Sequence, residues 1–279
     1  MNNLNKILAA IAFLFSLVIY ILTMAPTTSF WDCGEFIATS VIMGVPHPPG
    51  TPFYLLLGNF FSQIPTFDDT GARVNLISPI FSAFAVMFLY LIIVQLIKEW
   101  RGDVKSWPDC LITYGSAMIG ALTFAFTDSH WFNAVEAEVY SISTFFTGIV
   151  VWLILKWSTN SGHPGNVRYI LIIAYMFGLA IGIHLLNLLA LPFIALIVYF
   201  NKYEFKIGSF VATMGVTLFT FMVIYLGIIK GIPNLANSYG LNLPIFMVLA
   251  VFAATAYAVW KKHNQLSTIL TCLVLILIG

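Results

Sequence analysis

The segment Trp31-Asp32-Cys33-Gly34-Glu35 places two carboxylates three residues apart, directly after a long apolar run. If the segment is helical, both side chains project from one face. Such a pair can take a proton from a hydroxyl, stabilise a developing positive charge or hold a divalent ion. Ordinary solvated acids in a loop are the simpler interpretation, and the spacing alone leaves both open.

Three further ionisable residues stand next to apolar stretches. His47 lies in a proline-rich turn, and an ordinary pKa of about 6.5 suits it to proton transfer or to contact with phosphate; a structural turn histidine is the alternative. Glu136 and Glu138 precede an apolar run, and on a helix they would point to different sides, one to the bundle and one to water. Glu138 is nearer that run and is the better functional candidate, although two interfacial acids would look the same.

Polar residues in two other segments could contact a substrate. His184 and Asn187 share a face if they are helical, but such a pair can also hold membrane helices together. Arg73 could bind a phosphate through two parallel hydrogen bonds. It could equally extend its charged group to water from a helix end.

The composition indicates an integral membrane protein. Hydrophobic residues make up 60% of the 279 positions and charged residues only 8%, against about 25% charged in soluble domains. A net charge of +1 gives no field that would attract nucleic acid. Three widely separated cysteines predict neither a disulfide framework nor a zinc site.

Apolar runs predict an all-α bundle with about nine membrane crossings. A 32-residue run at 169–200 would form a helix about 48 Å long, against a hydrocarbon core of about 30 Å. Because basic residues flank both of its ends, we expect two short helices with a turn near 182–187. The final run reaches the end of the chain without a polar stop, so we expect the N-terminal part of a longer protein. The other candidate spans are 6–25, 73–97, 110–127, 140–157, 207–229, 244–260 and 266–279.

The distribution of basic residues predicts the orientation. Lys and Arg favour the cytoplasmic side, and with a retained first span and a cytoplasmic N-terminus ten of the twelve fall inside. Residues 26–72 then form a long outer loop, with a helix at about 52–64 that is too short to span and lies flat or re-entrant. Thr51 is its expected N-cap and Pro52 its first residue. We treat residues 1–279 as a single transmembrane domain whose candidate site faces outward.

Five strings carry a resemblance to a known family. They resemble, in this order, a family of multi-pass bacterial membrane proteins, long a domain of unknown function, that is related to the protein O-mannosyltransferases of the GT-C glycosyltransferase class. The likeness covers about residues 5–200. The strings are Trp31-Asp32-Cys33-Gly34-Glu35-Phe36, His47-Pro48-Pro49-Gly50-Thr51-Pro52-Phe53-Tyr54, Arg73-Val74-Asn75-Leu76-Ile77-Ser78, Ala137-Glu138-Val139-Tyr140-Ser141 and Gly182-Ile183-His184-Leu185-Leu186-Asn187.

The resemblance implies a GT-C type bundle that transfers a sugar, such as mannose, from a polyprenyl-phosphate donor to a protein Ser or Thr hydroxyl. The implied chemistry is inverting, with a carboxylate of the first outer loop as the base, as in the base half of an inverting glycoside hydrolase. By position the catalytic residues are Asp32 and its neighbour Glu35, and either could be the base. The residues expected to bind substrate are His47, Arg73, Glu138, Tyr140, His184 and Asn187.

The expected partners are the lipid-linked donor, the protein acceptor and membrane lipid, with no nucleic acid. We expect no cofactor, and a divalent metal is not indicated. The expected location is a bacterial inner membrane, with the site on the periplasmic face. A transporter or a flippase for a lipid-linked substrate is the alternative, although the sequence lacks the internal repeat common in transporters; a catalytically incomplete scaffold is a third.

Overall fold

The computed structural model describes residues 2–48, 50–163 and 165–279, and these form helices and connecting loops with no strand. Pro49, within one of the five strings, lies outside the described residues. The chain divides into two compact units. The first unit is Met1–Trp152 with Gly182–Leu185, and the second is Leu153–Ile181 with Leu186–Gly279.

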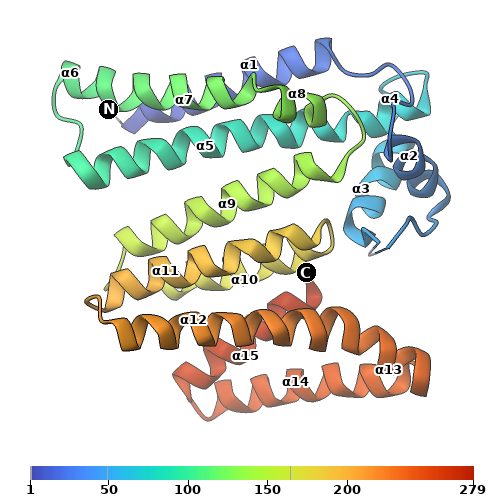
Figure 1. The fold of residues 1–279 in the computed structure, drawn as a ribbon, viewed down its shortest axis with the longest axis vertical. Coiled ribbons are helices and arrows are strands. Elements are labelled where there is room, and N and C mark those ends of the chain that lie inside the picture. Colours follow the sequence, from blue (N-terminus) through green and yellow to red (C-terminus); the bar gives the residue numbers. More distant parts are fainter. Residues whose placement is uncertain (1, 49, 164) are drawn as a thin grey trace. The chain divides into compact units, whose positions relative to one another are not determined.

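Long antiparallel helices form the body of the first unit (Figure 1). Buried alanines allow the helices of this core to approach closely. The ring of Phe145 packs 5.2 Å from that of Phe81 and 5.8 Å from that of Phe88, which joins the helix at 139–159 to the helix at 77–101. These helices are α1 (Asn2–Leu22), α5 (Ile77–Arg101), the π-helical segment η1 (Leu111–Gly115) with α7 (Ser116–Ala125), and the first part of α9 (Val139–Thr159).

Short helices collect at one end of this unit. Because α1, α5, α7 and α9 alternate in direction, the loop after α1 and the loop between α7 and α9 emerge at the same end (Figure 1). That end carries α2 (Cys33–Ile42), α3 (Pro52–Gln63), α4 (Thr70–Asn75) and α8 (Asp128–Ala134), whereas α6 (Trp107–Cys110) lies at the other.

The second unit confirms the expected break in the 32-residue run. Helix α10 (Val167–Ile181) ends before the turn, and the chain continues through the 3-10 helix η2 (Leu185–Leu189) into α11 (Ala190–Lys202). Asn187 Nδ2 donates to the carbonyl of Ala180 at 2.9 Å, which satisfies an end group of α10. The remaining elements are α12 (Ile207–Met222), the π-helical segment η3 (Val223–Gly231), α13 (Ile232–Tyr239), α14 (Asn242–Trp260) and α15 (Asn264–Ile278).

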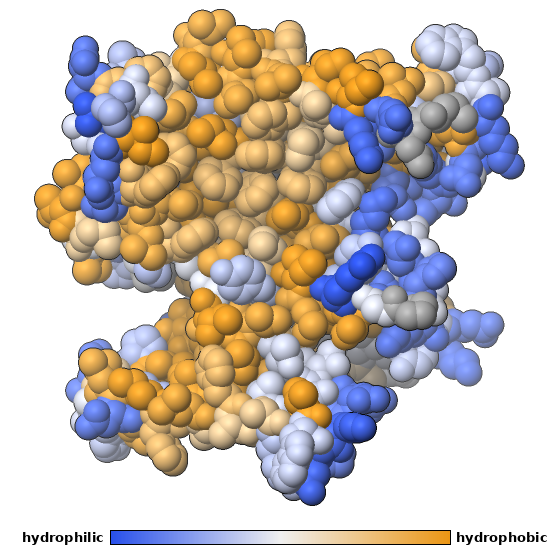
Figure 2. Space-filling view, turned by 180° about the vertical axis from the view of Figure 1, so that it is seen from behind, coloured by the Kyte–Doolittle hydropathy of each residue, from blue (hydrophilic) through white to orange (hydrophobic). Residues whose placement is uncertain are grey.

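The described helices do not confirm the predicted number of crossings. Within the described ranges six helices are long and apolar enough to cross a membrane, or seven if α7 and α8, bent by 68°, count with α6 and η1 as one broken span. Each predicted span matches a helix, but α10 and α15 have 15 residues each. That length gives only about 22 Å at 1.5 Å per residue, so nine crossings are not confirmed. Figure 2 shows apolar side chains over the middle of the helices and hydrophilic ones at their ends.

The predicted loop helix is present as α3, with Pro52 as its first residue. Thr51 occupies the predicted N-cap position, but its side chain makes no capping hydrogen bond and its hydroxyl is buried without a partner among the described residues. Helix α3 instead packs on α2, where Gly58 lies directly against Ser40. Asn59 Nδ2 also donates to the carbonyl of Ser40 at 3.0 Å.

Substituting Gly58→Ala should lower the free energy of unfolding. A Cβ there would lie 2.6 Å from Ser40 Cβ and closer still to its Oγ, and overpacking of this kind costs about 1–3 kcal/mol. Thermal unfolding in detergent measures the effect. Gly215→Ala is the matched control, because a Cβ at that helical position meets nothing within 4 Å. Equal midpoints for the two variants would contradict the close packing of α2 on α3.

Candidate active site

Asp32 stands at the start of α2 with its carboxylate exposed. It occupies the N-cap position but makes no capping hydrogen bond through its side chain. The preceding residue, Trp31, has a φ of 59°, a left-handed conformation that costs a non-glycine residue about 1–2 kcal/mol. Glu35 follows in the first turn of α2, where the helix dipole favours a negative charge.

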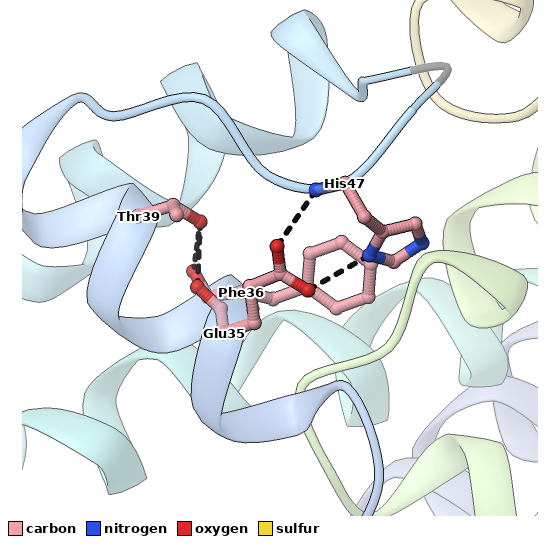
Figure 3. Close-up of polar contacts among 4 residues, drawn as sticks. All are labelled: Glu35, Phe36, Thr39 and His47. Carbon is pink, nitrogen blue, oxygen red and sulfur yellow. Dashed lines mark hydrogen bonds and ion pairs between the residues drawn. The ribbon is translucent and has the colours of Figure 1, made fainter.

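Glu35 is paired with His47, twelve residues further along the chain (Figure 3). The backbone N–H of His47 donates to Glu35 Oε1 at 2.7 Å, and Nδ1 of its ring lies 2.8 Å from Oε2. The hydrogen bond from His47 lowers the pKa of Glu35, and the bond to Glu35 raises the pKa of His47. The pair therefore favours a carboxylate next to an imidazolium, with Nε2 on the side of the ring away from Glu35.

The end of α2 explains how the chain returns to Glu35. Met43 adopts a φ of 51°, and the helix closes with the N–H of Gly44 donating to the carbonyl of Thr39 at 2.8 Å. This left-handed ending reverses the chain. The His47 ring then packs 5.8 Å from the buried ring of Phe36. Sequence reasoning did not predict this pairing.

Asn75 is a fully buried amide that connects three segments. Its Nδ2 donates to the carbonyls of Ala25 at 2.8 Å and Thr27 at 2.9 Å, at the start of the outer loop. Its Oδ1 accepts from the backbone N–H of Ala137 at 3.0 Å and from the thiol of Cys33 at 3.7 Å. Asn75 thereby holds Cys33, which follows Asp32, beside Ala137, which lies between Glu136 and Glu138.

Both Glu136 and Glu138 are buried, with 2% and 6% of their surfaces exposed. The expectation that one would face water is wrong, because the chain is not helical at residues 135–138 and helical spacing does not apply. The N–H of Glu138 points at Ser78 Oγ at 3.5 Å, and Ser141 Oγ donates to the carbonyl of Glu138 at 3.0 Å. One side-chain oxygen of Glu136 is buried without a partner among the described residues.

Electrostatic coupling connects Glu138 with the first outer loop. Burial and, after it, the negative charges of Asp32 and Glu136 together raise the pKa of Glu138 to about 7, against the opposing effects of the backbone N–H of Val139 and the charge of His47. The pKa of His47 is in turn raised by Asp32 and Glu138, after the larger effect of Glu35. The structure therefore brings Asp32, Glu35 and His47 together, with Glu138 near enough to interact electrostatically with Asp32 and His47.

Tyr140 and His184 lie side by side in the same unit. Their ring centroids are 5.2 Å apart, with Tyr140 exposed and His184 half-buried. Burial lowers the pKa of His184. The N–H of Phe53 donates to the carbonyl of Gly182 at 3.1 Å, which ties the turn before His184 to the start of α3. Asn187 belongs to the other unit and is buried beside α10.

Arg73 is engaged with backbone carbonyls at the end of α3 and in the loop between α3 and α4. Its guanidinium donates to the carbonyls of Phe67 at 2.6 Å, Ser62 at 3.2 Å and Asp68 at 3.4 Å. These bonds hold the loop in place. A role for Arg73 in binding substrate stays a prediction.

Asp32, Glu35 and His47 are the residues that could hold a metal ion. One ligand atom from each lies within 4.8 Å of the others. Two carboxylates and an imidazole suit a divalent transition metal. However, both carboxylate oxygens of Glu35 already contact nitrogen atoms of His47, so the same groups are explained by their ion pair.

The site residues that sequence reasoning missed are Asn75 and Ser78. Their signal was present, since two polar side chains three residues apart at the start of an apolar helix share a face. Both are fully buried, and both hold the segment that carries Glu138.

Comparisons with known proteins place the chain among relatives. The family model described as Protein O-mannosyl-transferase TMEM260 N-terminal domain matches residues 32–207, which include every predicted site residue. The chain is 29% identical over 189 residues to Protein O-mannosyl-transferase tmem260 of Dictyostelium discoideum, covering 63% of this chain and 21% of that protein. It is 25% identical over 163 residues to Protein O-mannosyl-transferase TMEM260 of Mus musculus, covering 58% and 21%.

The chain thus spans about a fifth of the length of these curated relatives (21% of each). The predicted relation to protein O-mannosyltransferases is confirmed. No solved structure matches the chain.

Substituting Asn75→Ala should expose Cys33 to thiol reagents. Cys33 is fully buried and burial raises the pKa of its thiol, so it should react slowly in the wild type. Without Asn75, the backbone groups of Ala25, Thr27 and Ala137 lose their hydrogen-bond partner, each at a cost of about 1–3 kcal/mol. The packing around Cys33 should therefore loosen. Maleimide labelling followed by peptide mass spectrometry measures this, with the buried Cys110 as internal reference. Asn133→Ala is the control, because Asn133 bonds only within its own helix; equal labelling in both variants would contradict the role of Asn75.

Proposed function

Since the chain belongs to the Protein O-mannosyl-transferase TMEM260 N-terminal domain family, we propose that it forms the catalytic end of a membrane glycosyltransferase. The enzyme moves a mannose from a polyprenyl-phosphate donor to Ser or Thr hydroxyls of a protein. The observation that carries the proposal is the convergence of an exposed carboxylate, a carboxylate–histidine pair and a buried glutamate at one end of the first unit.

Asp32 is the base in this proposal. Both carboxylate oxygens of Glu35 contact nitrogens of His47, whereas the exposed carboxylate of Asp32 makes no capping bond. The acceptor O–H bond breaks as its oxygen attacks C1 of the sugar, and the proton passes to Asp32. The bond between C1 and the phosphate oxygen breaks, its electron pair leaves with the phosphate, and the configuration at C1 inverts.

His47 supplies positive charge where the phosphate leaves. Glu35 orients the imidazole and favours its protonated form, which leaves the Nε2–H as a donor to a phosphate oxygen. Glu35 thus acts through His47 rather than on the acceptor. Tyr140 and His184 supply ring surfaces, and Arg73 holds the segment before α4.

The proposed enzyme lies in a bilayer with a cytoplasmic N-terminus and the site on the outer face, which in a bacterium is the periplasmic face of the inner membrane. The lipid-linked donor would reach the site from the bilayer, and no cofactor takes part. A flippase is less well supported, because its ionisable groups would lie midway along the helices. Here the ionisable groups (Asp32, Glu35, His47 and Glu138) belong to segments at one end of the first unit.

Asp32→Asn should reduce transfer by about 10²–10⁴-fold, the usual contribution of a positioned general base. Glu35→Gln should cost less, because a glutamine oxygen still accepts from His47. The assay uses the full-length protein in membranes, a polyprenyl-phosphate mannose donor and an acceptor protein. Asp128→Asn, an exposed acid on α8, serves as control. Full activity in Asp32→Asn would exclude Asp32 as the base.

The orientation can be tested with single cysteines in a background without native ones. We expect Thr28→Cys, in the exposed loop before α2, to react with a membrane-impermeant maleimide added outside. Asp103→Cys, exposed after α5, should react only after the membrane is permeabilised. The reverse pattern would place the candidate site in the cytosol and remove the proposed function.

A further inference from the structure

We propose that one end of the second unit binds an anionic phospholipid. The phosphate lies between Lys202 and Lys262, and one acyl chain lies in the groove between α11 and α12. The proposal goes beyond sugar transfer, because these elements carry none of the residues assigned to catalysis. It gives membrane lipid a defined site in addition to its role as the surrounding solvent.

Two basic turns meet at this end of the unit. The end of α11, the start of α12, the end of α14 and the start of α15 lie together there (Figure 1). Helices α11, α12 and α14 belong to candidate membrane spans, so the turns at their ends lie at the level of the lipid headgroups. Residues 202–206 and 261–263 contain four lysines against one acid, Glu204. Basic clusters of this kind at a membrane surface attract anionic lipid.

A polar hollow of about 470 Å³ lies between α11 and α15. The residues that line it are Lys202, Asn264, Gln265, Thr268 and Ile269. A second hollow shares Asn264 and Gln265 with the first and is also lined by Lys262. Lysines from two different turns therefore flank one region whose other side chains carry amide and hydroxyl groups. Ammonium, amide and hydroxyl groups can all donate to phosphate oxygens.

Both lysines keep their positive charge available to an anion. They are exposed, and within the described ranges neither forms an ion pair. Nζ of Lys202 lies 5.8 Å from the centre of the Trp157 ring, a contact that leaves the charge in place. Lys262 has a φ of 57° in the tight turn between α14 and α15. The N–H of His263 donates there to the carbonyl of Ala258 at 3.0 Å, which holds the turn.

An apolar groove of about 430 Å³ leads along α11 to Lys202. Its lining includes Leu191, Ala195 and Val198 of α11 and Ala212, Val216 and Thr220 of α12. Lys202 follows Val198 by four residues, so it lies on the same face of α11, one turn nearer the membrane surface. An acyl chain in this groove would end in a headgroup beside Lys202.

The charged end of the groove is held rigidly by Tyr199, which is also part of its lining. The Tyr199 hydroxyl is bonded to Ser209 Oγ at 2.8 Å and accepts from the N–H of Lys206 at 3.0 Å. These bonds fix the turn between α11 and α12, so little order is lost when a ligand enters. A phospholipid accounts for the hollow and the groove together, whereas free phosphate would use the hollow alone.

The first experiment measures lipid binding to the full-length protein in detergent by native mass spectrometry. Phosphatidylglycerol should bind at least about tenfold more tightly than phosphatidylcholine, whose choline offsets the phosphate charge. Lys202→Gln and Lys262→Gln should each weaken phosphatidylglycerol binding about fivefold, the usual effect of one lysine at a membrane surface. Lys230→Gln, in η3 and outside both hollows, is the control. Equal affinity for the two lipids, or unchanged binding in both lysine variants, would overturn the proposal.

The second experiment separates a lipid from free phosphate by thermal unfolding of the same protein. Phosphatidylglycerol should raise the midpoint, and inorganic phosphate at the same concentration should not. Ala212→Leu should remove this effect by filling the groove, whereas Ala254→Leu, exposed on α14, should keep it. If Ala212→Leu does not fold, Val216→Phe fills the same groove.

Three results would contradict a lipid site. Phosphate could stabilise the protein as much as the lipid, which would make the free anion the ligand. The lipid could keep its full effect in a folded variant with a filled groove. The wild type could bind no phosphatidylglycerol, which would mean that another part of the full-length protein covers the hollow. None of these measurements needs transfer activity, so they decide the question even if the proposed function fails.

Discussion

The buried amide of Asn75 is the contact on which the candidate site depends. A primary amide is suited to this place, because it donates twice and accepts at the same time. Asn75 joins three segments that are distant in the sequence. They are the start of the outer loop at residues 25–27, the start of α2 at Cys33 and the segment before α9 at Ala137. Asp32 and Glu138, more than a hundred residues apart, are thereby brought into one electrostatic environment.

The arrangement places rigid parts around a solvent-accessible charge. Helices α2 and α3 pack closely, and between them lie the buried rings of Phe36 and Tyr54, with centroids 5.3 Å apart. The Glu35–His47 pair is exposed and adds little to the stability of the fold. Its importance lies in orientation, since the pairing fixes which nitrogen of His47 remains available to a ligand.

Hydrophobic runs predicted the helices well, including the break before His184 and the loop helix α3, because apolar length is a direct property of the sequence. The predicted number of crossings is not confirmed, since α10 and α15 have only 15 residues each. The Glu35–His47 pair depends on the left-handed backbone of Met43, which side-chain type does not reveal. The burial of both Glu136 and Glu138 depends on non-helical backbone held by Asn75, a contact across 62 residues.

The left-handed backbone at Trp31 has a consequence of its own. Glycine is the residue that adopts such angles without penalty, and strain of this kind persists only where the surroundings impose it. The chain nevertheless carries its largest type of side chain there, 84% exposed. The loop therefore offers a bare, flat indole one position before Asp32, a surface over which the non-polar face of a pyranose ring could settle.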